Sequence, residues 1–176
     1  MTQSNAYIRT GDLRSGFVIM YHDIFDLYHP YIGDKATLYY LFLLRSRNND
    51  ESNADIGKAW RGRNGVVEKF QLSYSTLPIL DDILEASGLV DIERKPIGRG
   101  KDKIYYIVHD PKDKREFRAT EELMAEGLRK VVTKYGAKAI GKLLGKEKRH
   151  LTTLTEITST ETEVIDYASV NEKELL

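Results

Sequence analysis

The stretch from Val66 to Val108, VVEKFQLSYSTLPILDDILEASGLVDIERKPIGRGKDKIYYIV, decides the fold of this chain. A short helix ends before Gln71 and Leu72, and Ser75 begins a second helix whose apolar residues recur at three-and-four spacing up to Gly88. Two runs of β-forming residues follow, joined by a loop with one proline and two glycines. Helix, turn, helix and hairpin in this order predict a winged helix-turn-helix.

A second apolar segment lies upstream, where Asp34 is a good N-cap for a helix from Lys35 to Arg47. Apolar residues cover nearly its whole circumference, as in buried helices. It is either the central helix of the domain or a helix whose excess apolar face forms a subunit interface. The interface residues would then be Tyr39, Tyr40, Phe42 and Leu43. The lead-in from Gly16 to Leu27 fits a strand or a helix equally well, and one short strand is expected at 56–60.

The chain beyond the hairpin predicts two more helices. After Pro111, Thr120 followed by two glutamates opens a helix that Gly136 ends. A second amphipathic helix from Ala137 to Arg149 places basic side chains on one stripe, opposite its apolar residues. This stripe consists of Lys138, Lys142, Lys146 and Arg149.

The length of 176 residues fits one compact domain with an appendage. We expect a flexible N-terminus over 1–15, a winged-helix domain over 16–115, a basic helical extension over 116–150 and an acidic, Thr-rich tail over 151–176. The tail is expected to be disordered and solvated, to bind a partner, or to cover the basic helix and weaken its hold on nucleic acid. The fold class is therefore α+β, mainly α with a small β wing.

Composition excludes several classes of function. The chain has no cysteine, which excludes disulfides, thiol catalysis and Cys-ligated zinc. Its N-terminus lacks the apolar core of a signal peptide, and no apolar run is long enough to span a membrane. We therefore expect a cytoplasmic protein without a membrane partner. The formal net charge is zero, but the segment 127–150 is strongly basic and the tail is acidic.

Catalytic chemistry has little support in the sequence. The nearest approach to a metal cluster is the group His22, Asp23, Asp26 and His29. Its spacing matches no ligand template, and apolar residues interrupt it. The Gly-Arg-Gly run at 98–100 lacks the further glycines and the following helix of a phosphate loop. We therefore expect a protein that is not an enzyme and needs no metal or other cofactor.

The second helix of the motif would normally enter the DNA major groove, but its composition argues against base reading. Its exposed face is expected to carry Asp81, Asp82 and Glu85, and it has no Lys or Arg to match base edges. Contacts at its N-terminus would come from Tyr74, Ser75 and Thr76. We expect the wing and the basic stripe to contact phosphates without sequence preference. The alternative for both is a charged face that is merely solvated and binds no partner. The wing residues are Arg94, Lys95, Arg99, Lys101 and Lys103.

The segment 27–44, LYHPYIGDKATLYYLFLL, resembles the opening of the bacterial helicase-loader and primosome family of DnaB/DnaD type, which includes phage and plasmid replisome organisers. The matching residues are Tyr28, Pro30, Ile32, Gly33, Ala36, Leu38, Tyr39 and Leu41 or Phe42. Similar stretches follow at 72–73, 77–90, 105–106 and 110–136, so the likeness covers roughly 16–144.

The resemblance implies a winged-helix domain that self-associates and docks other proteins during replication initiation. Family members generally carry a second helical domain, with a Tyr-x-x-x-Ile-x-x-x-Trp type segment for single-stranded DNA. This chain has no such segment, and its only tryptophan is Trp60 in the polar loop. The family's single-strand binding and helicase loading therefore cannot simply be carried over to this chain.

The leading hypothesis is a non-enzymatic winged-helix protein of DNA replication initiation or primosome assembly. It would act through self-association, docking of replication proteins and weak, nonspecific contact with double- or single-stranded DNA. The first alternative is a winged-helix transcriptional regulator that binds operator DNA. A protein interaction module without DNA binding comes next, and a metal-dependent enzyme that uses the histidine and aspartate group is the most remote.

Overall fold

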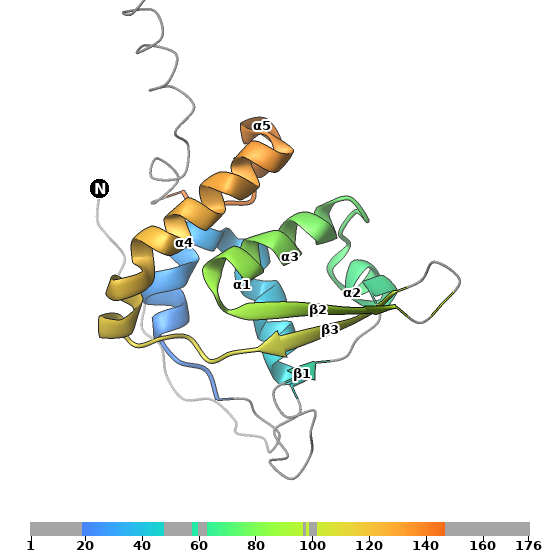
Figure 1. The fold of residues 1–176 in the computed structure, drawn as a ribbon, viewed down its shortest axis with the longest axis horizontal. Helices are drawn as coiled ribbons and strands as arrows, with labels where there is room; N and C mark the ends of the chain where they lie inside the picture. The colour runs from blue at the N-terminus through green and yellow to red at the C-terminus, as the bar shows by residue number, and fades with distance from the viewer. Residues whose placement is uncertain (1–18, 48–57, 60–62, 97, 99–101, 147–176) are drawn as a thin grey trace, which may run out of the picture.

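The structure, a computed structural model, describes residues 19–47, 58–59, 63–96, 98 and 102–146 (Figure 1). This part is mainly helical with a small antiparallel sheet, which confirms the expected α+β class. None of its helices combines the length and apolarity needed to cross a bilayer. In chain order the elements are η1 (Ile24–Tyr28), α1 (His29–Arg45), β1 (Lys58–Ala59), α2 (Arg63–Phe70), α3 (Thr76–Ser87), β2 (Val90–Pro96), β3 (Asp102–Val108), α4 (Lys114–Tyr135) and α5 (Ala137–Ile140).

Helix α1 is the centre of the core, packed against α3 and β3. Tyr39, Tyr40 and Leu43 are buried by the chain's own elements, and the Tyr40 hydroxyl donates to the carbonyl of His109 at 2.7 Å. Phe42 is half-buried, with its ring edge-on to Phe70 at a centroid distance of 5.2 Å. The central-helix interpretation is therefore correct. The subunit interface expected at Tyr39, Tyr40 and Leu43 is wrong, because these side chains are enclosed, whereas the interface role expected for Phe42 stays a prediction.

A kink at Gly33 divides α1, because this residue has φ 77° and ψ 177°. The helix expected to begin at Lys35 therefore starts earlier, because the residues before the kink are helical too and continue the π-helical turn η1. A Cβ atom at Gly33 would overlap the backbone carbonyl of Leu143. Glycine is needed here both for its positive φ and for this close approach.

The turn between α2 and α3 follows the expected pattern closely. Helix α3 begins after Ser75 and ends at Gly88, whose φ of 74° gives the left-handed conformation common at helix ends. Pro78 lies in the first turn, where its missing amide hydrogen costs nothing. The capping side chain is that of Ser73, whose Oγ accepts a hydrogen bond from the Thr76 amide at 3.2 Å.

Strands β2 and β3 form an antiparallel ribbon, and β1 pairs with the other edge of β3 in the order β1-β3-β2. Strand β1 lies within the expected 56–60 region. The ribbon is longer than expected, because β2 continues to Pro96 and β3 starts at Asp102. Part of the basic segment expected to be loop is therefore strand, with a fixed register.

Helix α4 lies against α3 (Figure 1) and starts at Lys114, not at Thr120 as expected. The Asp113 carboxylate accepts a hydrogen bond from the Glu116 amide at 2.8 Å and so caps the earlier start. The helix expected from Ala137 to Arg149 is wrong as well. Helix α5 ends at Ile140, and the following turns fold back until the Gly145 amide donates to the Tyr31 carbonyl at 2.8 Å.

Candidate nucleic-acid interface

Helix α3 presents little surface to solvent, since Glu85 is its only exposed residue in Thr76–Ser87. Asp81, expected on the exposed face, has 1% of its surface accessible. Its carboxylate accepts hydrogen bonds from the Tyr39 hydroxyl at 3.1 Å and the Tyr106 hydroxyl at 3.4 Å. The surface position expected for Asp81 is therefore wrong. A charge at this position is inside the core and does not meet DNA.

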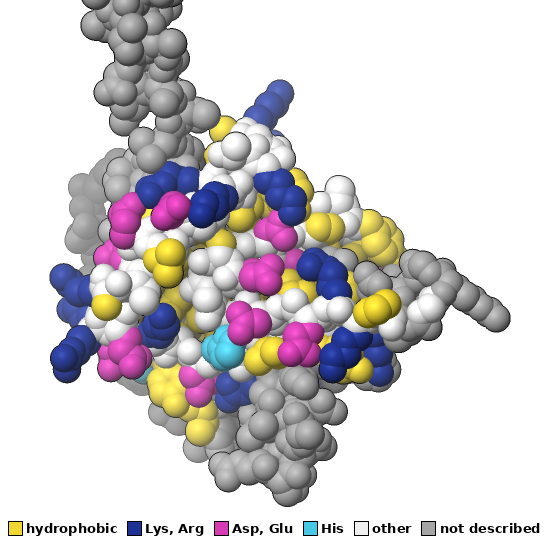
Figure 2. Space-filling view, in the orientation of Figure 1, with side chains coloured by type: hydrophobic (Ala, Val, Ile, Leu, Met, Phe, Trp, Pro, Cys, Tyr) yellow, Lys and Arg dark blue, Asp and Glu magenta, His cyan; other side chains and the backbone are white. Residues whose placement is uncertain are grey.

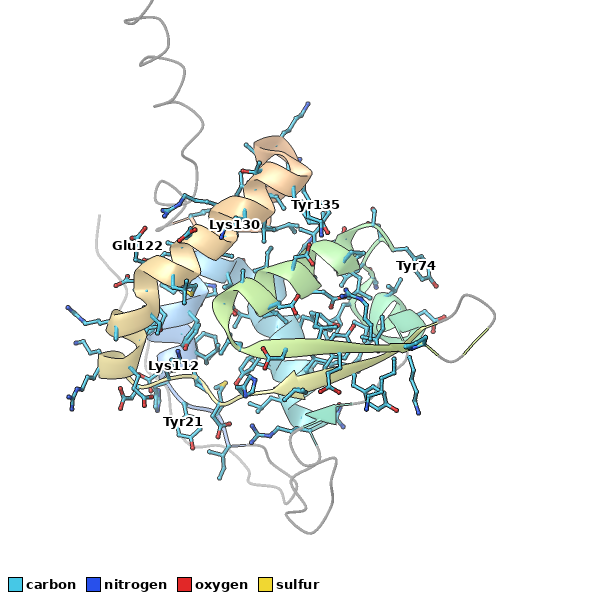
Figure 3. All side chains as sticks on the ribbon, viewed as in Figure 1. Tyr21, Tyr74, Lys112, Glu122, Lys130 and Tyr135 are labelled. Carbon is cyan, nitrogen blue, oxygen red and sulfur yellow. The ribbon has the colours of Figure 1, made fainter. Side chains whose placement is uncertain are left out.

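Asp82 of α3 is held by the C-terminal end of α4. Its Oδ2 accepts hydrogen bonds from Lys134 Nζ at 2.6 Å and from the Tyr135 hydroxyl at 2.8 Å, and Figure 3 shows Tyr135 at this end of the helix. The hydrogen bond to Asp82 raises the pKa of Lys134, and burial together with the same carboxylate raises the pKa of Tyr135. Helix α4 thus occupies part of the α3 surface that a groove-binding helix would need.

The predicted contacts Tyr74, Ser75 and Thr76 lie together at the open N-terminal end of α3. Ser73 Oγ lies 2.8 Å from Ser75 Oγ and 2.7 Å from Thr76 Oγ1, so these hydroxyl groups bond to one another. Tyr74 has 64% of its surface exposed and is labelled in Figure 3. It is an exposed large aromatic side chain at this end of the helix.

The predicted wing residues divide between the two faces of the β2–β3 ribbon. Side chains alternate along a strand, and the register places Lys95, Lys103 and Tyr105 on one face and Arg94 on the other. The ammonium groups of Lys95 and Lys103 lie 5.1 and 5.2 Å from the centre of the Tyr105 ring. Arg99 and Lys101 lie outside the described residues.

Lys95 and Lys103 are direct cross-strand partners. Like charges at such positions destabilise a sheet, by up to about 1 kcal/mol, and the aromatic face of Tyr105 offsets part of this repulsion. Lys95 also forms an ion pair with Glu93, with 3.9 Å between its Nζ and Glu93 Oε2. Figure 2 shows acidic and basic side chains interspersed over the face formed by α3, α4 and the ribbon. That face as a whole therefore carries no patch of a single sign, and the basic side chains at the outer part of the ribbon are one of several groups on it.

The predicted basic stripe is not a helical stripe. Lys138 is exposed on α5, whereas Lys142 and Lys146 follow in the turns beyond it, and Arg149 lies outside the described residues. These turns bring Lys142 and Lys146 to the kink of α1, where they line a cavity of about 360 Å³ together with His29 and Lys35. Lys35 was missed because nothing in its local sequence indicates a contact with so distant a segment.

The group His22, Asp23, Asp26 and His29 does not come together. Among the described residues, no three His, Asp or Glu side chains are placed so that they could hold a metal ion. His29 instead lies with its Nε2 2.7 Å from Asp34 Oδ1, across the kink of α1.

The lead-in carries exposed apolar side chains that the sequence pattern did not identify. Exposure cannot be read from so short a run, because neither helix nor strand periodicity is established in it. These residues are Ile19, Met20, Tyr21 and Phe25, of which Tyr21 is labelled in Figure 3.

In comparisons with known proteins, no family model, no curated protein and no solved structure matches this chain.

Proposed function

We propose that this chain is a non-enzymatic winged-helix protein of a DNA replication-initiation or primosome assembly. It contacts nucleic acid weakly, without sequence preference, through the β2–β3 ribbon. The order α1-β1-α2-α3-β2-β3, with a three-stranded sheet, supports the winged-helix assignment. The resemblance of 27–44 to the helicase-loader and primosome family supports the replication role.

The observation that carries the proposal is the pair formed by Lys95 and Lys103. The two lysines directly opposite each other place two positive charges on one face of the ribbon, where a phosphate group could bind between them. The adjacent Tyr105 ring adds an aromatic surface of the kind on which bases of a single strand stack. Lysines bind phosphate as point charges, and such contacts carry no sequence information.

A sequence-specific regulator is less well supported by the geometry of α3. Base reading needs exposed side chains that can reach into the major groove. Within α3 only Glu85 is exposed, and Tyr74 is exposed just before the N-terminus of the helix. Its Asp82 is engaged by α4. The helix that would read an operator therefore serves mainly as a packing element.

Protein docking, including self-association, fits the lead-in better than α1. Ile19, Met20, Tyr21 and Phe25 are exposed close together in sequence, and large apolar side chains gathered at a surface are typical of interaction sites. This cluster also favours a second candidate function, a protein interaction module without nucleic-acid binding.

A salt series with the double variant Lys95→Gln, Lys103→Gln tests the proposal. Fluorescence anisotropy with labelled single-stranded and duplex DNA should give a linear fall of log K with log salt concentration for the wild type. In the variant, the magnitude of this slope should decrease by about 1 for each phosphate that the ribbon no longer neutralises. The decrease should be the same for all DNA sequences.

The matched control is Lys114→Gln with Arg115→Gln, which removes two exposed charges from the first turn of α4. An unchanged slope in the ribbon variant would reject the ribbon as the binding surface. If the wild type binds no DNA even at low salt, the nucleic-acid proposal falls and the interaction module takes its place.

A further inference from the structure

We propose that the cavity between the α1 kink and the turns after α5 binds a backbone phosphate of a nucleic-acid strand, through Lys35, Lys142 and Lys146. This inference rests on the nucleic-acid binding in the proposed function and adds a second binding site, separate from the ribbon. The cavity of about 360 Å³ lies within the range of roughly 300–1,000 Å³ usual for ligand pockets.

The three lysines reach the cavity from distant parts of the chain. Lys35 follows Gly33 on α1, while Lys142 and Lys146 flank the turn that packs on the kink. All three residues are exposed at the rim. The fold therefore adds the charge of Lys35 to that of two lysines from the basic segment 127–150.

The positive charge of these lysines is not neutralised within the described residues. Lys130 and Lys134 each have an acidic partner, at 3.0 and 2.6 Å, but Lys35, Lys142 and Lys146 form no ion pair in that part of the chain. The one acid in the lining, Asp34, is engaged by His29 at 2.7 Å. Within the described residues, an anion entering the cavity would thus meet three lysines that have no ion-pair partner to be displaced, beside the one carboxylate of Asp34.

Backbone packing fixes the position of these lysines. A Cβ at Gly33 would overlap the Leu143 carbonyl, and a Cβ at Gly145 would overlap the Pro30 carbonyl. The Gly145 amide also donates to the Tyr31 carbonyl at 2.8 Å. Two glycines therefore let the turn and the kink touch backbone to backbone, which leaves little freedom in the separation of Lys35 from Lys142 and Lys146.

The chemistry of the lining selects a phosphate and not a base or a sugar. Besides the lysines, His29 and Asp34, the described lining consists of proline, glycine and leucine. It has no amide or hydroxyl side chain to recognise a base edge, and no Tyr, Phe or Trp on which a base could stack. Lysine ammonium groups at an open rim suit a phosphodiester within a longer strand, held without sequence preference.

The test compares two triple variants of the full chain by fluorescence anisotropy in a salt series. The cavity variant is Lys35→Gln, Lys142→Gln, Lys146→Gln, and the control is Lys69→Gln, Lys114→Gln, Arg115→Gln, which removes the same charge from exposed positions elsewhere. The cavity variant should lower the salt slope by about 1 for each phosphate released, and the control should leave it near the wild-type value. The single variant Lys35→Gln repeats the test without touching the turn.

Equal slopes for the cavity and control variants would overturn the inference. If the ribbon variant lowers the slope and the cavity variants do not, the proposed function stands and the cavity assignment falls. If the wild type binds no DNA, both fail. Amide NMR shifts of Lys35 and Gly145 provide the second arm. Shifts on addition of an oligodeoxythymidylate would support binding of a nucleic-acid strand. Shifts with inorganic phosphate but not with the oligodeoxythymidylate would overturn this inference in favour of a site for free phosphate.

Discussion

Asp81 is a carboxylate enclosed in the core and shared by two tyrosines. The Tyr39 hydroxyl donates to its Oδ1 from α1, and the Tyr106 hydroxyl donates to its Oδ2 from β3. One residue of α3 thus ties the central helix to the sheet. Buried polar groups of this kind are costly unless every member is bonded, so the arrangement depends on all three side chains.

We expect Asp81→Ala to lower the free energy of unfolding by about 2–4 kcal/mol, because two phenolic hydroxyls lose their acceptor inside the core. Urea denaturation followed by circular dichroism measures the change. Glu85→Ala removes an exposed acid from the same helix and should change the free energy by less than about 0.5 kcal/mol. Similar values for the two variants would show that Asp81 is not a structural anchor.

Buried tyrosines should also make the fold sensitive to alkali. Burial raises the pKa of both Tyr39 and Tyr40 above the unfolded value of about 10. Above that pH the unfolded chain releases protons that the folded chain retains, so unfolding becomes more favourable as pH rises. Stability should be complete below about pH 10 and then fall by about 1.4 kcal/mol per pH unit for each such tyrosine.

The variant Tyr39→Phe should reduce this alkaline slope, measured as the free energy of unfolding between neutral and alkaline pH. Tyr74→Phe is the control, because Tyr74 is an exposed tyrosine. A slope that is the same in wild type and Tyr39→Phe would contradict the assignment of the effect to the core.

Among the elements, α4 changes what α3 can do. Its end engages Asp82 through Lys134 and Tyr135, and Gly127 permits a close approach, since a Cβ there would lie 3.2 Å from the Ala86 Cβ. Helix α3 is therefore covered along its length by the core on one side and by α4 on another.

Asp82→Ala should loosen the end of α4 without unfolding the chain. Hydrogen exchange of the amides at 128–135 should become faster, while exchange in α1 stays unchanged, because the hydrogen bonds that this variant removes join only α3 and α4. Glu85→Ala, on the same helix but without a partner in α4 among the described residues, should leave both unchanged. If the amides at 128–135 exchange at the same rate in Asp82→Ala as in Glu85→Ala, apolar packing alone holds α4.

Local signals in the sequence predicted the elements whose ends they determine. The start of α3 after Ser75 was predicted, although the capping side chain is that of Ser73, and Gly88 and Gly136 marked the ends of α3 and α4. The start of α4 was missed, because the acids after Thr120 were favoured over the cap at Asp113. The longer strands were missed because proline and glycine in the basic segment indicated a loop, whereas cross-strand pairing extends the ribbon up to Pro96.

The site was harder to predict, because its parts come together only through long-range packing. The sequence identified Lys95 and Lys103 as wing cations, but their cross-strand pairing follows from the register. Asp81 was placed at the surface because helical periodicity cannot show which tyrosines lie opposite. Lys35 joins Lys142 and Lys146 only because two glycines let distant backbones touch.

For the molecule as a whole, the exposed lead-in should control self-association. We expect the chain to form oligomers at high concentration in light scattering, and Met20→Ser with Phe25→Ser to shift it toward the monomer, because exposed apolar area drives the association. Leu123→Ser is the control, since Leu123 is the most exposed of these side chains, at 71%, but lies on α4. A wild type that is monomeric at all concentrations would contradict this role.

The nucleic-acid binding that we propose would rest on phosphate groups, since α3 is largely covered and the two proposed basic sites use lysines. The most direct test is the affinity of the full chain for a panel of duplexes of unrelated sequence at one low salt concentration. We predict measurable binding with affinities that agree within about threefold, since phosphate contacts carry no sequence information. A preference of about a thousandfold for one sequence, which is typical of specific recognition, or the absence of binding to every duplex and single strand, would contradict it.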